Sequence, residues 1–396
     1  MGVRILRYMH STGASAFFVV VYLHMFRALI YGSYKKPREL IWIFGMLIFV
    51  VLMAEAFMGY VLPWGQMSYW GAQVIISLFG AIPVVGEALV EWFRGDYLIS
   101  GITLNRFFAL HVVALPIVLL ALVLLHLLAL HEVGSNNPDG VEIKKNKGPD
   151  GIPVDGVAFH PYYTVHDLQA IAVFLFIFCF VIFFMPEVGG LFLEAPNFEI
   201  ANPLKTPEHI APVWYFTPYY SVLRAIPDKF WGFVAFAASV AIPFLLPWLD
   251  TSKVKSMRYR PVAKQFFMGF VVACLLLGWC GASNPDDAVI SMGEDKLTVA
   301  YTDAAGLEGQ RTFEDYAPAA QFRDDQVASG GVAAMSVQKA PAFTFKTLSQ
   351  ILTAYYFAFF LLILPILGLR ERPKGEPDSI HQSILGHDAP AAAPAE

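Results

Sequence analysis

Long apolar stretches separated by polar segments dominate the pattern of this chain. A helix needs about 20 mostly apolar residues to cross ~30 Å of hydrocarbon, and seven stretches meet that requirement. We therefore predict seven membrane-spanning helices, at about residues 5–31, 39–61, 105–130, 167–187, 229–249, 263–281 and 346–368.

The basic residues of the connecting segments favour one orientation, because cytoplasmic loops carry an excess of Lys and Arg. Three segments are rich in these residues: Lys35, Lys36 and Arg38; Lys253, Lys255, Arg258 and Arg260; and Arg370, Arg372 and Lys374. We predict that these three face the cytoplasm. The segments that then face outward are 62–104, 188–228 and 282–345. The mixed charge of segment 131–166 does not indicate on which side of the membrane it lies.

This orientation places residue 1 on the outer side, with Arg4 and Arg7 at the translocated end. A membrane protein that begins there without a preceding helix is unusual. We therefore expect that an upstream helix is missing from this sequence, through truncation or a misplaced start codon.

The three outward segments differ in composition. Segment 62–104 is rich in Trp, Gly and Pro and predicts short interfacial helices. Segment 188–228 is rich in prolines and aromatics, which is typical of an ordered cap over a site. Ten acidic against four basic residues over 282–340 indicate a solvated periplasmic insertion. That insertion is either a small lobe or a flexible loop.

Composition supports a polytopic membrane protein, since 57% of the residues are hydrophobic and only 15% are charged, against about 25% in soluble domains. No basic patch indicates nucleic-acid binding. Cys179, Cys274 and Cys280 all lie in apolar runs, which predicts buried thiols and no disulfide framework. No C-x-x-C-H motif is present, so any haem is bound non-covalently, as b-type.

Four histidines lie inside two of the apolar stretches at matched spacing. His10 and His24 are 14 residues apart, and His111 and His126 are 15 apart. On a helix this is about four turns, or ~21 Å along the axis, so both members of a pair face the same way. Ionisable groups at membrane depth are costly and usually functional.

Two such helices side by side offer one histidine pair near each membrane face, and paired histidines are axial ligands of low-spin haem. The spacing therefore predicts two b haems that carry electrons across the membrane. The alternative is that each histidine is a hydrogen-bonded structural residue, as a single buried histidine commonly is.

Five sequence strings carry a family resemblance: RYMHSTGAS at 7–15, GYVLPWGQMSYWGA at 59–72, HEVGSNNPDG at 131–140, FHPYYTVHD at 159–167 and PVWYFTPYYSVLRAIPDK at 212–229. In them the chain resembles cytochrome b of the respiratory cytochrome bc complex (ubiquinol–cytochrome c reductase, complex III), of the proteobacterial type. The similarity runs from residue 4 to about 281 and resumes over 346–370.

The resemblance implies an all-α polytopic protein of the bacterial inner membrane, with seven of the family's eight transmembrane helices, built as a di-haem four-helix bundle and a C-terminal helical part. The implied regions are a haem-binding bundle that lacks the first family helix (1–187), a C-terminal helical region with the quinol-site loop (188–281), the periplasmic insertion (282–345), the last transmembrane helix (346–370) and a flexible cytoplasmic tail (371–396).

Residue by residue, the resemblance assigns His10 and His111 to the low-potential haem near the outer face. His24 and His126 then ligate the high-potential haem near the inner face. The orientation from loop charges agrees, because His10 is at the outer end of its stretch and His24 lies deeper.

Arg7 and Arg27 match family positions that pair with haem propionates. Gly13, Gly45 and Gly59 fit positions where a haem or a helix backbone approaches closely, and ordinary helix packing is the alternative explanation.

The resemblance also implies an outer quinol-oxidation site between the end of the second stretch and the 212–220 segment. Its predicted residues are Tyr60, Gly71, Pro212, Trp214, Tyr215 and Tyr220.

The chain departs from the best-known family motif at Val213, where that motif has Glu. Valine cannot accept a proton, yet quinol oxidation releases two. Glu55, four residues before Gly59 and on the same helical face, is our candidate for the replacement proton acceptor. The alternative is a structural hydrogen bond from Glu55 to the 212–220 segment.

For the inner quinone-reduction site the resemblance implies His131, Ser135 and Asp167, with His166 as a secondary candidate. An imidazole and a carboxylate on either side of a quinone can deliver protons as electrons arrive. His160 is assigned to structure or to a water network.

The implied activity is quinol oxidation outside, with one electron leaving to a Rieske iron–sulfur protein and the other crossing the two haems to reduce quinone inside, so that protons are moved across the membrane. The implied partners are that Rieske protein, a membrane-anchored c-type cytochrome, quinone, membrane lipid and a second copy of the complex.

Three alternatives stay open. A di-haem membrane anchor of a dehydrogenase or hydrogenase needs the four histidines but not the PVWY segment. A transporter or structural subunit binds no haem and has no visible absorption, and the chain can also be an unassembled remnant.

Overall fold

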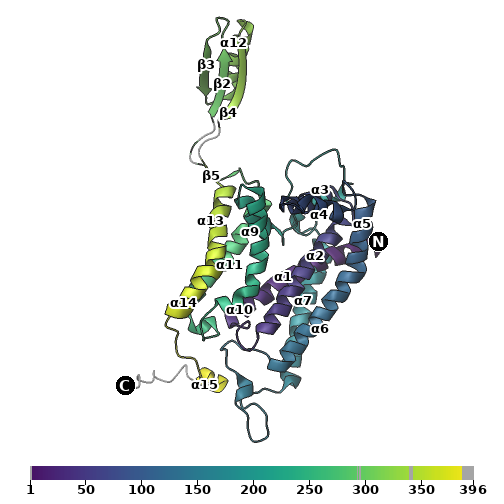
Figure 1. Cartoon of the computed structure of the whole chain (residues 1–396), viewed down its shortest axis with the longest axis vertical. Helices are drawn as coiled ribbons and strands as arrows, with labels where there is room; N and C mark the ends of the chain where they lie inside the picture. The colour runs from purple at the N-terminus through teal and green to yellow at the C-terminus, as the bar shows by residue number, and fades with distance from the viewer. Residues whose placement is uncertain (1, 292, 294–295, 339–341, 386–396) are drawn as a thin grey trace. The chain divides into compact units, whose positions relative to one another are not determined.

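The computed structural model describes residues 2–291, 293, 296–338 and 342–385, which are mostly helical (Figure 1). Seven helical segments of this described part are long and apolar enough to span a membrane: Gly2–Tyr31, Glu39–Val61, Gly101–Val133, Phe159–Phe184, Lys229–Leu249, Pro261–Ala282 and Phe345–Arg370. Each overlaps one predicted stretch. The predicted polytopic helical class is therefore confirmed.

Three spans are single helices: α1 (Gly2–Tyr31), α2 (Glu39–Val61) and α11 (Pro261–Ala282). The other four contain a 3-10 or π turn: α5 (Gly101–Ala109), η2 (Leu110–Ala114) and α6 (Leu115–Val133); η4 (Phe159–Tyr163) and α7 (Thr164–Phe184); α9 (Lys229–Ala241), η7 (Ile242–Leu245) and α10 (Leu246–Leu249); and α13 (Phe345–Ala358), η9 (Phe359–Ile363) and α14 (Leu364–Arg370). Pro116, Pro161, Pro243 and Pro365 lie in or next to these turns. Proline has no N–H to donate, which interrupts the regular helix there.

The two segments 62–104 and 188–228, which are predicted to face outward, are ordered, as expected. They contain α3 (Gln66–Leu78), η1 (Phe79–Ala81), α4 (Gly86–Arg94), η5 (Val188–Gly190), η6 (Ala195–Phe198) and α8 (Thr217–Ala225). The segment 188–228 folds onto α3, since the Gln66 amide donates to the Glu199 carbonyl at 3.0 Å. Its α8 is tied to α11, because Arg224 donates to the carbonyls of Cys280 and Gly281 at 2.7 and 3.0 Å.

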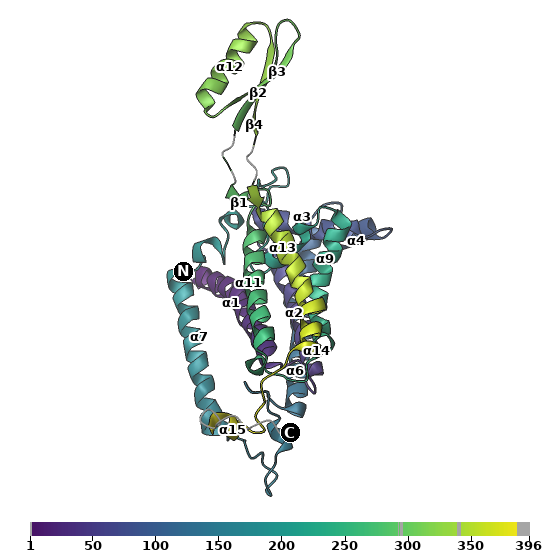
Figure 2. The same cartoon turned by 90° about the vertical axis from the view of Figure 1, so that its left-hand side faces the viewer.

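Figure 2 shows α7 at one edge of the helix group, where it packs against α1. Elsewhere in the group, α8 packs against both α9 and α11. An apolar cavity lies between α1 and α7 and is lined by side chains that include Ala16, Val20 and Phe174.

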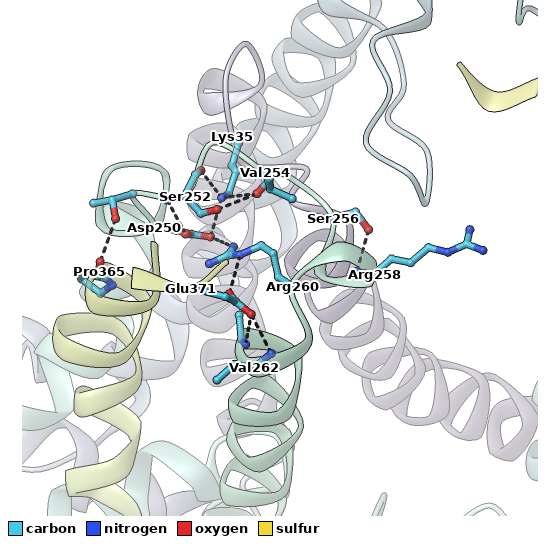
Figure 3. Close-up of polar contacts among 12 residues, drawn as sticks. Lys35, Asp250, Ser252, Val254, Ser256, Arg258, Arg260, Val262, Pro365 and Glu371 are labelled. Carbon is cyan, nitrogen blue, oxygen red and sulfur yellow. Dashed lines mark hydrogen bonds and ion pairs between the residues drawn. The ribbon is translucent and has the colours of Figure 1, made fainter. Parts of the chain in front are cut away.

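The three predicted cytoplasmic segments meet at one end of the helices (Figure 3). The side chain of Asp250 is completely buried and forms ion pairs with Lys35 at 3.0 Å and with Arg260 at 2.7 Å. Arg260 also lies 3.5 Å from Glu371, next to the third basic segment. Burial alone would raise the pKa of Asp250, but Lys35 and Arg260 outweigh it and lower that pKa.

The segment 131–166, which the sequence left undecided, joins the same end. Its Glu142 pairs with Arg38 at 2.6 Å and with Lys255, and its Asp139 pairs with Arg258 at 2.8 Å. All of the predicted cytoplasmic loops are thus linked by buried or half-buried ion pairs.

Residues 283–349 form a compact unit of their own. Three antiparallel strands in the order β3 (Glu308–Phe313), β2 (Lys296–Thr302), β4 (Val332–Gln338) are covered by α12 (Tyr316–Ala328), and β1 (Ala288–Ser291) pairs with β5 (Ala342–Thr344). Val299 on β2 and Ala319 on α12 are completely buried in its small core. The segment is a folded lobe with strands that the sequence analysis did not predict.

The predicted flexible tail, 371–396, is partly held in place. Lys374 donates its amide to the Tyr259 carbonyl at 2.8 Å, and the first amide of α15 (Ile380–Leu385) donates to Asp155 at 3.0 Å. Residues 386–396 lie outside the described residues.

Candidate functional site

The four histidines of the apolar stretches lie in two facing pairs. His10 on α1 faces His111 on η2 with ring centroids 6.1 Å apart and ring planes at 82°. His24, also on α1, faces His126 on α6 at 6.4 Å and 60°. The π turn that carries His111 is a local distortion of the kind often found at functional sites.

The spacing of each pair fits a metal held between two imidazoles. With a metal–nitrogen distance of ~2 Å, two imidazoles on opposite sides of one ion have ring centroids ~6 Å apart. Two glycines of α2 face the rings. A Cβ added at Gly59 would collide with the His111 ring, 2.9 Å from Nδ1, and one at Gly45 would lie 3.3 Å from Cε1 of His126. A side chain at Gly59 would push the His111 ring out of place, whereas one at Gly45 would require only a small shift of the His126 ring.

The two family arginines lie on α1 beside the histidine pairs. Arg27 is 3.0 Å from Nδ1 of His24, and Arg7 is exposed one turn before His10. Nothing lies within 4 Å of a Cβ added at Gly13, so this side of α1 borders open space. The residues present therefore leave room for a flat cofactor with charged edges and offer two cations for those edges.

Glu55 lies at the outer histidine pair. Nδ1 of His111 is 2.9 Å from both the carboxylate and the backbone carbonyl of Glu55. The second carboxylate oxygen of Glu55 is buried without a hydrogen-bond partner in the described part of the chain. These contacts are to a predicted haem ligand and not to the 212–220 segment, which favours a role toward the ligand. The predicted proton-acceptor role stays a prediction.

The C-terminal end of α2, predicted to face outward, carries a half-buried polar cluster. The Tyr60 hydroxyl donates to the carboxylate of Glu194, and the Asn197 side-chain amide donates to the Tyr60 oxygen at 2.7 Å and to Glu194 at 3.0 Å. Burial raises the pKa of Glu194, and the hydrogen bonds from Tyr60 and Asn197 partly oppose that rise. The sequence analysis missed Glu194.

The 212–220 segment packs against α1. Trp214 Nε1 donates to Ser15 at 3.2 Å, and the Tyr215 ring stacks on Phe18 at 3.9 Å. Val213 is only 5% exposed, so it lies in the apolar packing. Burial raises the pKa of Tyr215, and the negative charge of Glu194 adds to that rise.

The remaining predicted residues of the outer site lie on α3, in the 212–220 segment and on α8. Gly71 on α3 is buried, Pro212 is half-buried, and the Tyr220 hydroxyl donates to the Ile210 carbonyl at 3.3 Å. Arg224 lies over the Tyr220 ring at 4.4 Å. The structure thus joins Tyr60 to Glu194 by a hydrogen bond, and it packs Trp214 and Tyr215 against α1.

The predicted inner-site residues are not joined to one another. Across the described residues, no hydrogen bond or ion pair links His131, Ser135 and Asp167. The Ser135 carbonyl accepts from Arg38 at 3.3 Å, and the His131 carbonyl accepts from Lys144 at 3.3 Å.

Within the described part of the chain, the hydrogen bonds of His166 and His160 are local. The Nδ1 atom of His166 is 3.0 Å from the Tyr162 carbonyl, and that of His160 is 3.3 Å from the Thr164 hydroxyl. Both contacts are within one helical turn, which agrees with a structural role for His160.

Comparison with known proteins identifies the class of this chain as a polytopic electron-transport protein. Two family models match it: cytochrome b/b6/petB over residues 2–134 and cytochrome b (C-terminal)/b6/petD over residues 200–302. The cytochrome b of Allochromatium vinosum is 57% identical over 292 residues, which cover 72% of this chain and 70% of that relative. The cytochrome b of Rhodospirillum rubrum is 44% identical over 380 residues, which cover 96% and 77%.

A solved structure named "Hyperthermophilic respiratory Complex III" has a similar fold, with a TM-score of 0.73 and 37% identity. It covers 93% of this chain, and this chain covers 80% of it. The chain belongs to the cytochrome b family, and the predicted family and its location as a multi-pass protein of the bacterial inner membrane are confirmed.

Proposed function

We propose that this chain oxidises quinol near its outer end and reduces quinone near its inner end, as the cytochrome b subunit of complex III. Membership of the cytochrome b family is the observation that carries this proposal. The protein works in the respiratory chain, and its family implies b-type haems and quinone.

We further propose that His10 with His111 and His24 with His126 are the axial ligands of two haems. The support is the matched 6.1 and 6.4 Å spacing of the rings and the glycines that leave space for them. When bound, each haem supplies a one-electron carrier. Arg7 and Arg27 are proposed to pair with the propionates, because guanidinium groups form strong charge-assisted hydrogen bonds with carboxylates.

At the outer site, Tyr60, Trp214 and Tyr215 are proposed to bind and orient quinol. The two tyrosine hydroxyls and the three ring faces suit a flat molecule with two hydroxyl groups. We propose that Gly71, Pro212 and Tyr220 border the same site.

At the inner site, we propose that His131 and Asp167 hold protons for the quinone oxygens, with Ser135 as a hydrogen-bond partner. His131 follows the ligand His126 on the same helix, α6, and an imidazole can hold or give a proton near neutral pH. His166 is a secondary candidate.

We propose as partners a Rieske iron–sulfur protein, a membrane-anchored c-type cytochrome and a second copy of the complex. The similar solved structure is a respiratory complex III, which supports an assembly of this kind. We also propose that the lobe 283–349 faces the periplasm, because the basic segments at the far ends of its two flanking spans favour the cytoplasmic side.

The test is to purify the assembled complex and record its redox difference spectrum and its quinol–cytochrome c reductase activity. We expect b-type bands and quinol-dependent reduction of cytochrome c. Bands without that activity would instead support a di-haem anchor, and a lack of visible absorption would support a subunit without haem.

A further inference from the structure

The outer quinol site lacks a carboxylate at the position where the best-known family motif has one, because Val213 occupies it and is buried. Oxidation of one quinol releases two protons, so the site needs groups that can take them. Glu55 is engaged with His111. The structure offers another carboxylate, Glu194, in the outward segment before α8.

Glu194 is held against Tyr60 by a fixed scaffold. The amide of Asn197 donates to the Glu194 carbonyl at 3.0 Å, and the Asn197 side chain donates to both Tyr60 and Glu194. The side-chain oxygen of Asn197 in turn accepts from the Ser68 amide at 2.8 Å, which ties this turn to the first turn of α3. The Tyr60–Glu194 pair is therefore positioned by both α2 and α3.

The surroundings of the pair contain tyrosines and no ion-pair partner. Among the described residues, the titratable groups that act on Glu194 or feel its charge are Tyr60 on α2 and Tyr215 in the 212–216 segment. Both are predicted quinol-site residues. None of the described ion pairs includes Glu194. A half-buried carboxylate without a cation binds a proton more readily than an exposed one.

We infer that Glu194 accepts one of the two quinol protons through the hydroxyl of Tyr60. The Tyr60 oxygen accepts one hydrogen bond from Asn197 and keeps a further acceptor position for a quinol hydroxyl. As the quinol O–H bond breaks, Tyr60 gains that proton and gives its own to Glu194, so a new O–H bond forms on the carboxyl group.

The step balances within the proposed function, on which it rests. The two electrons leave to the acceptors of the complex III reaction, and Tyr60 ends in its original state. Glu194 then releases its proton to the outer aqueous phase. Val213 therefore needs no ionisable side chain, since the carboxylate is supplied from the segment 188–200 instead.

The experiment compares E194Q with Glu199→Gln in the purified complex. Glu199 is an exposed glutamate five residues further along the same segment, which makes it a matched control. We expect E194Q to lower the rate of quinol oxidation by about 10²- to 10⁴-fold, as loss of a general base does. The acid limb of the pH profile, where the wild-type rate rises as Glu194 ionises, should disappear in E194Q only.

A second readout is the infrared difference spectrum of the complex with quinol against quinone. A protonated-carboxyl band should be present in the wild type and in Glu199→Gln and missing in E194Q. An unchanged rate and pH profile in E194Q, or equal losses in both variants, would overturn the inference.

Glu194→Asp covers the case in which E194Q does not assemble. It keeps the carboxylate but shortens its reach to Tyr60, so the variant should retain activity with a shifted acid limb of the pH profile. An acid limb at the wild-type position would overturn the inference. Failure of the proposed function is a separate result, because a wild-type complex would then lack b-type bands or quinol oxidation before any substitution.

Discussion

Nδ1 of His111 lies 2.9 Å from a carboxylate oxygen of Glu55. Metal-ligating histidines commonly donate their second ring N–H to a carboxylate, which fixes the ring and makes the ligating nitrogen more basic. Glu55 is thus placed to tune the haem that His111 is proposed to hold.

Glu55→Gln tests this role directly. An amide is a weaker acceptor than a carboxylate, so His111 becomes less basic and the ferric state is stabilised less. We expect the midpoint potential of the low-potential haem to rise by tens of millivolts, while the other haem stays unchanged. Potentiometric titration measures both haems, with the exposed Glu91→Gln as the control. If Glu55→Gln instead abolished the pH dependence of quinol oxidation and left the midpoint potential of the low-potential haem unchanged, Glu55 would be favoured as the proton acceptor.

Substitutions at the two glycines of α2 should differ in severity. At Gly59 an added methyl group collides with His111, whereas at Gly45 it meets His126 at 3.3 Å, where a small shift suffices. We predict that Gly59→Ala loses most of the outer haem and that Gly45→Ala keeps most of the inner one. Haem content per complex and difference spectra measure this. Gly101→Ala, which has nothing within 4 Å, is the control, and equal haem loss in both α2 variants would contradict the account.

The buried carboxylate of Asp250 should be critical for stability. Its removal leaves Lys35 and Arg260 buried without their shared anion (Figure 3). Removing one partner of a buried ion pair costs about 3–5 kcal/mol. Asp250→Ala should therefore lower the thermal unfolding midpoint of the complex in detergent. The exposed Asp378→Ala should not, and equal midpoints for the two variants would count against this network.

The buried amino group of Lys35 should make the folding stability of the protein depend on pH. Burial lowers its pKa to about 8 from 10.5, with Asp250 partly opposing that effect. Between these two values the unfolded chain binds more protons than the folded one, so stability from this group rises with pH across that window. In Lys35→Met the rise should be absent. Thermal midpoints measured across the window test this, and identical slopes in both proteins would refute it.

The spans and the histidine pairs could be predicted because their signals are local. Twenty apolar residues in a row determine a span, and the interval from His10 to His24 determines which face they share. The contact between Tyr60 and Glu194 has no such signal, since 134 residues separate them and the part of the segment around Glu194 contains only two short 3-10 turns. Only the fold brings Glu194 to the outer site.

The lobe illustrates the same limit. Residues 296–302 form a strand whose Val299 is buried against α12, but a seven-residue stretch in an acidic, Ala- and Gly-rich segment is a weak signal. The β-branched Thr298, Val299 and Thr302 were the available clue. The inner-site residues were chosen by resemblance, and the structure leaves His131 and Asp167 without a mutual contact that would support or refute them.

The central claim is that two haems are held by the pairs His10–His111 and His24–His126. The most direct measurement is a potentiometric titration of b-band absorbance in the purified complex, for the wild type, His111→Ala and His126→Ala. The account predicts two components in the wild type, loss of the lower-potential one in His111→Ala and of the higher-potential one in His126→Ala. Two unchanged components in either variant would contradict it.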